Sequence, residues 1–145
     1  MEALILSLLV WLGMRTDFNL PKDKSELPKI EYRTAEAMKI IVYGVIGSTI
    51  HKEVRASYDK NTLYLPKDFN PKDLKDQRTM LHELVHFLQD YNKRKYECRN
   101  VAEIEAYTIA TRWGQEYGIE DDYAAIWIFG PRGCFESIVQ PDFPH

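Results

Sequence analysis

Between about residues 74 and 91, apolar side chains recur with the 3.6-residue period of an α-helix, and this is the strongest structural signal in the chain. The same segment contains the HExxH pattern His82-Glu83-Leu84-Val85-His86. One helical turn separates the two histidines, so they project from one side of the helix, at the border of the apolar stripe. A fold for this chain has to bury that stripe, which consists of Met80, Leu81, Leu84, Val85, Phe87, Leu88 and Tyr91.

The HExxH pattern predicts a metal centre, because two imidazoles one turn apart can reach a single ion of zinc size. Glu83 lies about 60° around the helix from His86, where its carboxylate can accept a proton from a metal-bound water without competing for the ion. With only 4 His in the chain, about 0.01 chance matches to the pattern are expected. The competing interpretation is a pair of helix-surface histidines beside an incidental glutamate. Gln89, near the end of the same helix, either supports the site or faces solvent.

A catalytic zinc takes three protein ligands and keeps a fourth position for water, so a third ligand is needed. A second predicted helix, over about residues 100–114, offers Glu103 and Glu105. Glu105 points away, along the line of Thr108 and Arg112. Glu103 is therefore the predicted third ligand and Glu105 the alternative, because the face of Glu103 also carries residues that allow close helix packing: Ala106, Tyr107 and Ala110.

A second interpretation of Glu103 remains open. Asn100 resembles a helix N-cap, and a glutamate three residues later is the partner that reaches back to the cap in a capping box. In that case Glu105, or a residue that no motif marks, would be the third ligand.

The length of 145 residues and the content of 45% hydrophobic and 28% charged residues are typical of one globular domain. We expect a single α+β domain over residues 1–145, in which the two helices pack with a small β-sheet. Two strand-like runs within residues 54–65 flank Asp59-Lys60-Asn61, a spacing that suits a tight hairpin. Other expected elements are a strand over 30–33, a helix over 34–43 and a helix over 121–129.

Residues 2–13 are predicted to form an apolar helix, since Ala3 to Leu12 is apolar except at Ser7. This run is too short for a membrane span, which needs about 20 apolar residues. A secretory signal would place positive charge before the run, whereas Glu2 precedes it. The segment is therefore either a buried helix of the domain or an uncleaved targeting segment, and we expect no stable membrane span.

Charge argues against nucleic acid as a partner. The chain has 19 Lys plus Arg against 22 Asp plus Glu, a formal net charge of -3. Its longest basic run, Lys93-Arg94-Lys95, lacks the aromatic interleaving and the flanking basic face of a nucleic-acid-binding surface. The sequence does not indicate an oligomeric state.

Cys98 and Cys134, with 35 residues between them, do not form a CxxC motif. They form either one disulfide in an exported protein or two buried thiols in a reducing compartment. The compartment, cytoplasmic or exported, therefore stays open, and a Cys98–Cys134 disulfide would favour export.

HELVH, followed after sixteen residues by EIEAY, resembles the gluzincin group of zinc metallopeptidases, especially the very small minigluzincin-like bacterial proteins. In those proteins a short helix, a strand hairpin, the HExxH helix and a Glu-bearing helix make up nearly the whole zincin-like domain. The resemblance covers about residues 54–110. It implies that Glu103, the first Glu of an E-x-E-A motif, is the third zinc ligand with His82 and His86, and that Glu83 is the general base.

The resemblance implies hydrolysis of peptide bonds in a peptide or protein substrate, with one catalytic zinc. In zincins an exposed edge strand holds the substrate extended, and residues 54–58 or 62–65 could supply that edge. The alternative function is a binding or regulatory module of zincin fold in which zinc is structural.

The chain departs from this pattern at Tyr107. Several of the families have Asp or Asn at that place, four residues after the ligand Glu, and the Asp supports a zinc-bound histidine. Tyr107 would instead hydrogen-bond a histidine, stabilise a developing oxyanion, or pack as an aromatic residue on the helix face.

Overall fold

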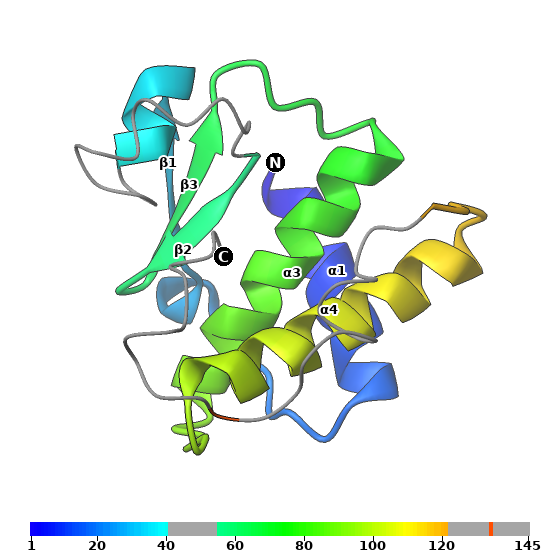
Figure 1. Ribbon diagram of the computed structural model, residues 1–145. Helices are drawn as coiled ribbons and strands as arrows, with labels where there is room; N and C mark the ends of the chain where they lie inside the picture. The colour runs from blue at the N-terminus through cyan, green and yellow to red at the C-terminus, as the bar shows by residue number, and fades with distance from the viewer. Residues whose placement is uncertain (41–54, 122–133, 135–145) are drawn as a thin grey trace.

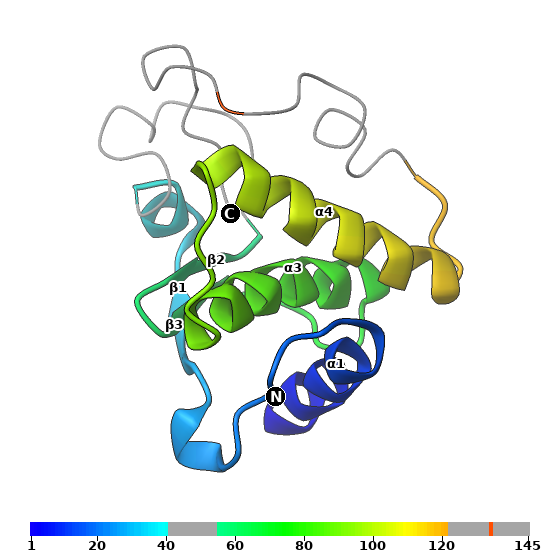
Figure 2. The same ribbon diagram turned by 90° about the horizontal axis from the view of Figure 1, so that it is seen from below.

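The computed structural model describes residues 1–40, 55–121 and 134. The fold is α+β, as expected, with a three-stranded mixed sheet and α-helices packed around one central helix (Figure 1). The central helix is α3, Leu74–Tyr91, which contains the HExxH pattern. Seen from below, α3 lies between α4, Arg99–Glu116, and α1, Glu2–Arg15 (Figure 2).

Helix α1 packs on α3 through a row of buried residues: Ile5, Leu8, Leu9, Trp11 and Leu12. It continues past Gly13 to Arg15, whereas the sequence predicts an end at residue 13. Gly13 allows Leu20 to pack closely on the helix, since a Cβ at this position would lie 2.7 Å from Leu20 Cδ1 and the leucine side chain would have to shift. Thr16 then ends the helix, where its backbone N–H and hydroxyl both donate to Leu12 O. Among the described helices, none combines the length and apolarity that crossing a membrane requires.

The sheet has the strand order β1-β3-β2, so β3, Thr62–Pro66, is the central strand. β1, Lys29–Arg33, runs parallel to β3, with Lys29 opposite Thr62. β2, Ser57–Asp59, runs antiparallel to β3. Because β3 is paired on both sides, residues 62–65 cannot supply a free edge for substrate, and β2 is the edge strand beside α3 in the described part of the sheet.

The expected hairpin is present, but β2 spans Ser57–Asp59 and not residues 54–58. Asp59 pairs with Thr62, so the turn is Lys60-Asn61 and not the three residues 59–61. Lys60 and Asn61 both have positive φ angles, 46° and 66°, as in the type I′ turns that match the twist of a two-stranded ribbon. Tyr58 Oη also accepts a hydrogen bond from Asn61 N at 3.1 Å.

An ion pair fixes the start of α3 against the segment that leads into β2. Asp76, in the first turn of α3, binds Arg55 through Nη2 at 2.9 Å and Nε at 3.2 Å. The same carboxylate accepts from Asn70 N at 2.9 Å, so the loop before the helix is held as well. Asp73 caps α3 by accepting from Lys75 N at 3.0 Å. The HExxH helix is therefore anchored to the sheet at its N-terminal end.

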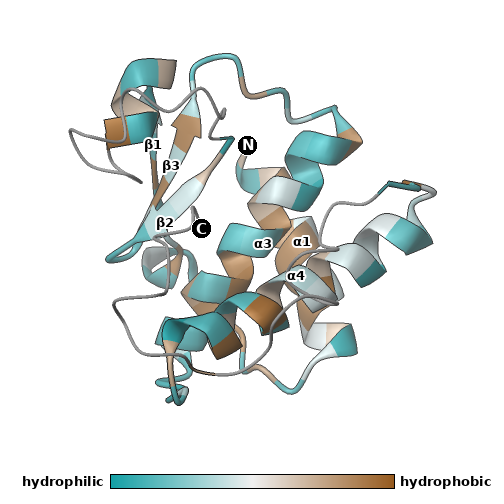
Figure 3. Ribbon diagram, viewed as in Figure 1, coloured by the Kyte–Doolittle hydropathy of each residue, from teal (hydrophilic) through white to brown (hydrophobic). Residues whose placement is uncertain are grey.

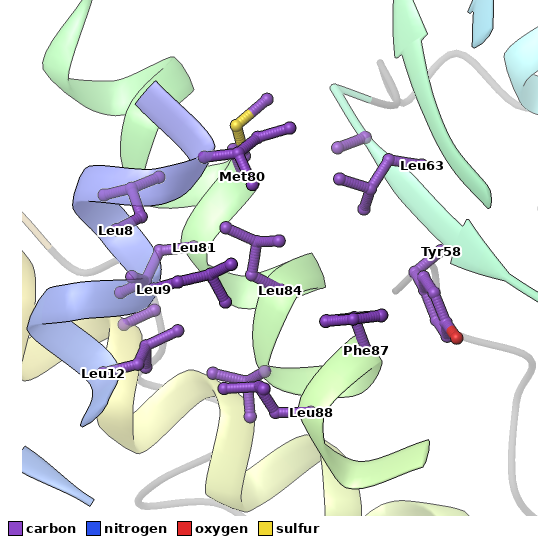
Figure 4. Packing of buried hydrophobic residues seen from close by; sticks show 14 of the residues in the cluster. Leu8, Leu9, Leu12, Tyr58, Leu63, Met80, Leu81, Leu84, Phe87 and Leu88 are labelled. Carbon is purple, nitrogen blue, oxygen red and sulfur yellow. The ribbon is translucent and has the colours of Figure 1, made fainter. Parts of the chain in front are cut away.

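The hydrophobic core lies on both sides of α3 (Figure 4). On one side Leu81 faces leucines of α1, and on the other side Phe87 faces the sheet. The Tyr58 and Phe87 rings meet edge to face, with centroids 6.2 Å apart. Hydropathy colouring shows that the apolar segments of α1 and α3 gather at the centre of the molecule (Figure 3). The stripe predicted from the sequence is thus shared between α1 and the sheet.

Some expected features fall partly or wholly outside the described residues. Residues 35–40 are helical, and Thr34 Oγ1 accepts from Ala37 N as a cap, but positions 41–43 of the expected helix are not described. The same holds for residue 54 of the hairpin segment and for residues 122–129 of the last expected helix. Cys98 and Cys134 form a disulfide, which decides between the two predicted states of these cysteines.

Candidate metal centre

Two helices bring the candidate ligands together. His82 and His86 project from α3 toward α4, and Glu103 projects from the second turn of α4 toward α3. Ala106 and Ala110 are fully buried, and their small side chains allow the close approach of the two helices that the sequence predicts. All three candidate ligands are buried, with exposed fractions of 1% for His82, 7% for His86 and 1% for Glu103.

The donor atoms of these three residues converge. His86 Nε2 lies 2.9 Å from Glu103 Oε1 and 3.2 Å from His82 Nε2. His82 Nε2 lies 3.2 Å from Glu103 Oε2. Zinc bonds of about 2.0–2.1 Å in a tetrahedral arrangement place ligand atoms about 3.3 Å apart, close to the 3.2 Å between the two Nε2 atoms. The two histidines face different oxygens of Glu103, and one ligand atom from each of the three residues lies within 4.8 Å of the other two. A two-imidazole, one-carboxylate set is also a zinc donor set.

Glu83 sits beside this group and is fully buried. Its Oε2 lies 3.7 Å from His82 Nε2, and no side chain among the described residues hydrogen-bonds either carboxylate oxygen. Burial, together with the nearby Glu103 carboxylate, raises the pKa of Glu83 well above its ordinary value. A buried carboxylate beside a second carboxylate is costly in free energy. A divalent cation held by His82, His86 and Glu103 would offset both the burial and the repulsion. The residues therefore fit a bound metal.

Tyr107 lies at the edge of the group. Its ring meets the His82 ring edge on, with centroids 4.3 Å apart and an interplanar angle of 66°. This contact places the Tyr107 ring directly against a candidate ligand. The ring restricts the orientation of His82 by packing.

Glu105, the alternative ligand, faces a different set of partners. Its Oε1 accepts from Gln89 Nε2 at 3.1 Å and from Tyr96 Oη at 2.5 Å. Gln89 in turn contacts His86, where Gln89 Oε1 lies 2.9 Å from Nδ1. The structure thus brings Glu103, and not Glu105, to the two Nε2 atoms.

The capping interpretation of Glu103 is wrong. Helix α4 begins at Arg99, and its N-cap is Cys98, which makes no side-chain cap hydrogen bond. Asn100 lies inside the first turn, so a glutamate at position 103 is not three residues after the cap. The Glu103 side chain is directed at the histidines instead.

A cavity of about 350 Å³ adjoins the group, bounded by β2, α3 and α4. Of the three candidate ligands, His86 lines it. The walls carry three cationic residues, Lys60, Arg94 and Arg99, and two acidic residues, Asp59 and Asp90. Arg94 is paired with Asp17 at 2.7 Å, and Asp90 accepts from Tyr58 Oη at 2.9 Å.

The sequence reasoning did not identify Tyr96 as part of this region, and it left Gln89 between two interpretations. Gln89 follows His86 at i+3 spacing, which puts both on one side of the helix, and this is the signal that could have found it. Tyr96 lies between α3 and α4, where no periodicity indicates the direction of a side chain.

A family described as a domain of unknown function, DUF6647, matches residues 1–142. No curated protein and no solved structure matches the chain. The family description assigns no activity, so the chemistry has to be argued from the buried His82, His86 and Glu103 group itself. Since the match covers nearly all of its length, this chain belongs to the DUF6647 family.

Proposed function

We propose that this protein is a zinc-dependent peptidase of the gluzincin type. His82, His86 and Glu103 would hold the zinc ion, and Glu83 would act as the general base. The observation that supports this most is the convergence of three buried side chains. The two imidazole Nε2 atoms lie 3.2 Å apart, and each lies 2.9 to 3.2 Å from a different carboxylate oxygen of Glu103. The carboxylate of Glu83 lies 3.7 Å from His82 Nε2.

Bound zinc supplies two things to hydrolysis, a water whose pKa is lowered from 15.7 to about 7 and polarisation of the scissile carbonyl. Glu83 accepts the proton of the attacking water and passes it to the leaving amine. Its burial shields this transfer from bulk water. His82 and His86 would hold the ion through Nε2, since these atoms face each other at 3.2 Å, and their ring orientation would set where the reaction occurs.

The substrate would approach from the side of β2. This strand pairs only with β3 in the described sheet, and it forms one wall of the cavity that His86 lines. An extended peptide could pair with the side of β2 that faces away from β3, which would present a peptide bond to the site. The substrate class that we infer is therefore an unfolded or extended polypeptide segment.

Tyr107 is the residue that we propose as stabiliser of the developing oxyanion. Its support is its place, since the ring lies against His82 at the border of the site. A hydroxyl donor held there would add electrostatic stabilisation in the transition state.

The disulfide bears on the compartment. Disulfides persist in oxidising environments and are rare in the cytosol. Because Cys98 and Cys134 are bonded, we infer that the protein works in an oxidising, exported location.

The test of this function is Glu83→Gln, a substitution that keeps the shape of the side chain and removes its basicity. We expect the variant to bind zinc like the wild type and to hydrolyse a broad peptide library about 10²- to 10⁴-fold more slowly. Glu36→Gln, at an exposed position outside the site, is the matched control and should leave the rate unchanged. Equal rates for wild type and Glu83→Gln would contradict the proposal.

One observation favours the second function, a non-catalytic zinc-stabilised binding module. Glu83 is fully buried and does not line the cavity, so a substrate has to reach it past His86. A wild-type protein that binds zinc stoichiometrically but cleaves no member of the library would support this alternative.

A further inference from the structure

Gln89 connects the candidate metal ligand His86 to helix α4. It is buried, with an exposed fraction of 5%, and it lies one turn after His86 on α3. Its amide oxygen, Oε1, is 2.9 Å from His86 Nδ1. Its amide nitrogen, Nε2, donates to Ala102 O at 3.0 Å and to Glu105 Oε1 at 3.1 Å.

The partners on α4 determine which way the amide faces. A backbone carbonyl oxygen can only accept hydrogen bonds, and so can an ionised carboxylate. The amide NH₂ of Gln89 must therefore point to Ala102 and Glu105, which leaves the carbonyl oxygen directed at His86. Since that oxygen can only accept, His86 Nδ1 must carry the proton. The lone pair of the neutral ring is then on Nε2, which faces Glu103 and His82.

Tyr96 holds the far end of this chain. Its hydroxyl donates to Glu105 Oε1 at 2.5 Å, on the same oxygen that Gln89 reaches. Burial and the hydrogen bond to Glu105 raise the pKa of Tyr96, so the hydroxyl remains protonated and must be the donor. Glu105 Oε1 therefore accepts hydrogen bonds from both Tyr96 and Gln89.

We propose that Gln89, held by Glu105 and Tyr96, is a positioning residue that fixes His86 as the Nδ1-protonated tautomer with Nε2 directed at the metal. The inference rests on the metal site of the proposed function. In the resembling families an acidic residue four positions after the ligand Glu supports a histidine, and this chain has Tyr107 at that position. Here the support would come from Gln89 on the HExxH helix. The role of Glu105 follows as well, since it acts on the site through Gln89 and His86.

The test is Gln89→Leu, which keeps a helix-forming side chain of similar size and removes both ends of the amide. Long-range ¹H–¹⁵N spectra of the metal-free protein, at a pH where the imidazoles are neutral, report which nitrogen of His86 carries the proton. We expect Nδ1 in the wild type and an Nε2-protonated population in the variant. Zinc affinity, measured by competition with a chromophoric chelator, should fall about 10- to 100-fold.

Two further variants separate positioning from a general loss of structure. Gln77→Leu makes the same change on the same helix, where the amide donates to Pro71 O and lies outside the metal group, and it should alter neither the tautomer nor the zinc affinity. Glu105→Ala should weaken zinc binding less than Gln89→Leu does. The double variant should bind no more weakly than Gln89→Leu alone, because both residues act through one hydrogen-bond chain.

An unchanged His86 tautomer in Gln89→Leu, or a zinc affinity within about threefold of the wild type, would overturn the inference. Additive losses in the double variant would also overturn it, since they would mean that Glu105 acts independently of Gln89. The tautomer is read without metal and without substrate. A wild type that fails to cleave peptides therefore contradicts the hydrolytic proposal alone, while a shifted tautomer in Gln89→Leu still supports the positioning role.

Discussion

Glu103 and Glu105 are separated by one residue, yet they serve different parts of the molecule. Glu103 lies within 3.2 Å of both Nε2 atoms, whereas Glu105 binds Gln89 and Tyr96. The direction in which each side chain points from the helix was sufficient to favour Glu103 from the sequence, because a step of two residues rotates that direction by about 200°. The contacts of Glu105 could not be predicted, since they depend on a tyrosine in a loop.

At the scale of a single residue, the role of the Tyr107 hydroxyl can be tested by removing its oxygen atom alone. Tyr107→Phe keeps the ring against His82 and removes the hydroxyl. We expect zinc affinity to be retained and kcat for peptide hydrolysis to fall about 10²-fold, the usual cost of losing one oxyanion donor. Chelator competition and steady-state kinetics on the same preparation measure the two quantities. A Phe variant with unchanged kcat would leave Tyr107 with a packing role only.

At the scale of elements, the helices that carry the site were the most predictable part of the fold. The period of 3.6 in α3 is a local property of the sequence, and the observed helix Leu74–Tyr91 has the range that the period indicates. The parallel pairing of β1 with β3 was not predictable, because it joins Lys29 to Thr62 across more than thirty residues. The second helix is predicted over about residues 100–114, whereas α4 spans Arg99–Glu116, because Cys98 and not Asn100 is the N-cap.

The contact between α1 and α4 depends on pH through Glu116. Its carboxylate accepts from Trp11 Nε1 at 2.6 Å and from Arg15 Nε at 3.1 Å. Both hydrogen bonds lower the pKa of Glu116, and the bond from Trp11 has the larger effect. Because the pKa is lower in the folded state, the ionised Glu116 stabilises the fold at pH values above the ordinary pKa of a glutamate. This stabilisation is lost as the pH falls through the lowered value.

We therefore expect the free energy of unfolding to drop more between about pH 6 and about pH 3 in the wild type than in Glu116→Gln. Urea unfolding over a pH series measures the free energy of unfolding of both proteins. In the difference between them, the pH dependence of the carboxylates that they share cancels. Glu36→Gln, at an exposed site, is the control and should follow the wild type. A gap between wild type and Glu116→Gln that stays constant with pH would contradict the role of this carboxylate.

At the scale of the whole molecule, the site depends on how α3 and α4 are held relative to each other. The disulfide joins Cys98, the N-cap of α4, to Cys134, and in the chain-entropy model a loop of this length stabilises the fold by about 3 to 4 kcal/mol. At the other end, Trp11 and Arg15 of α1 bind Glu116 in the last turn of α4. The sequence left the pairing of the cysteines open, because spacing alone does not report the redox state.

The central claim is that His82, His86 and Glu103 hold one divalent ion. The most direct measurement is elemental analysis of protein purified without added metal and then equilibrated with zinc, for the wild type beside Glu103→Ala and Glu105→Ala. The account predicts one zinc per chain in the wild type and in Glu105→Ala, and little or none in Glu103→Ala. A wild type without bound zinc, or a Glu103→Ala variant that keeps one zinc per chain, would contradict it.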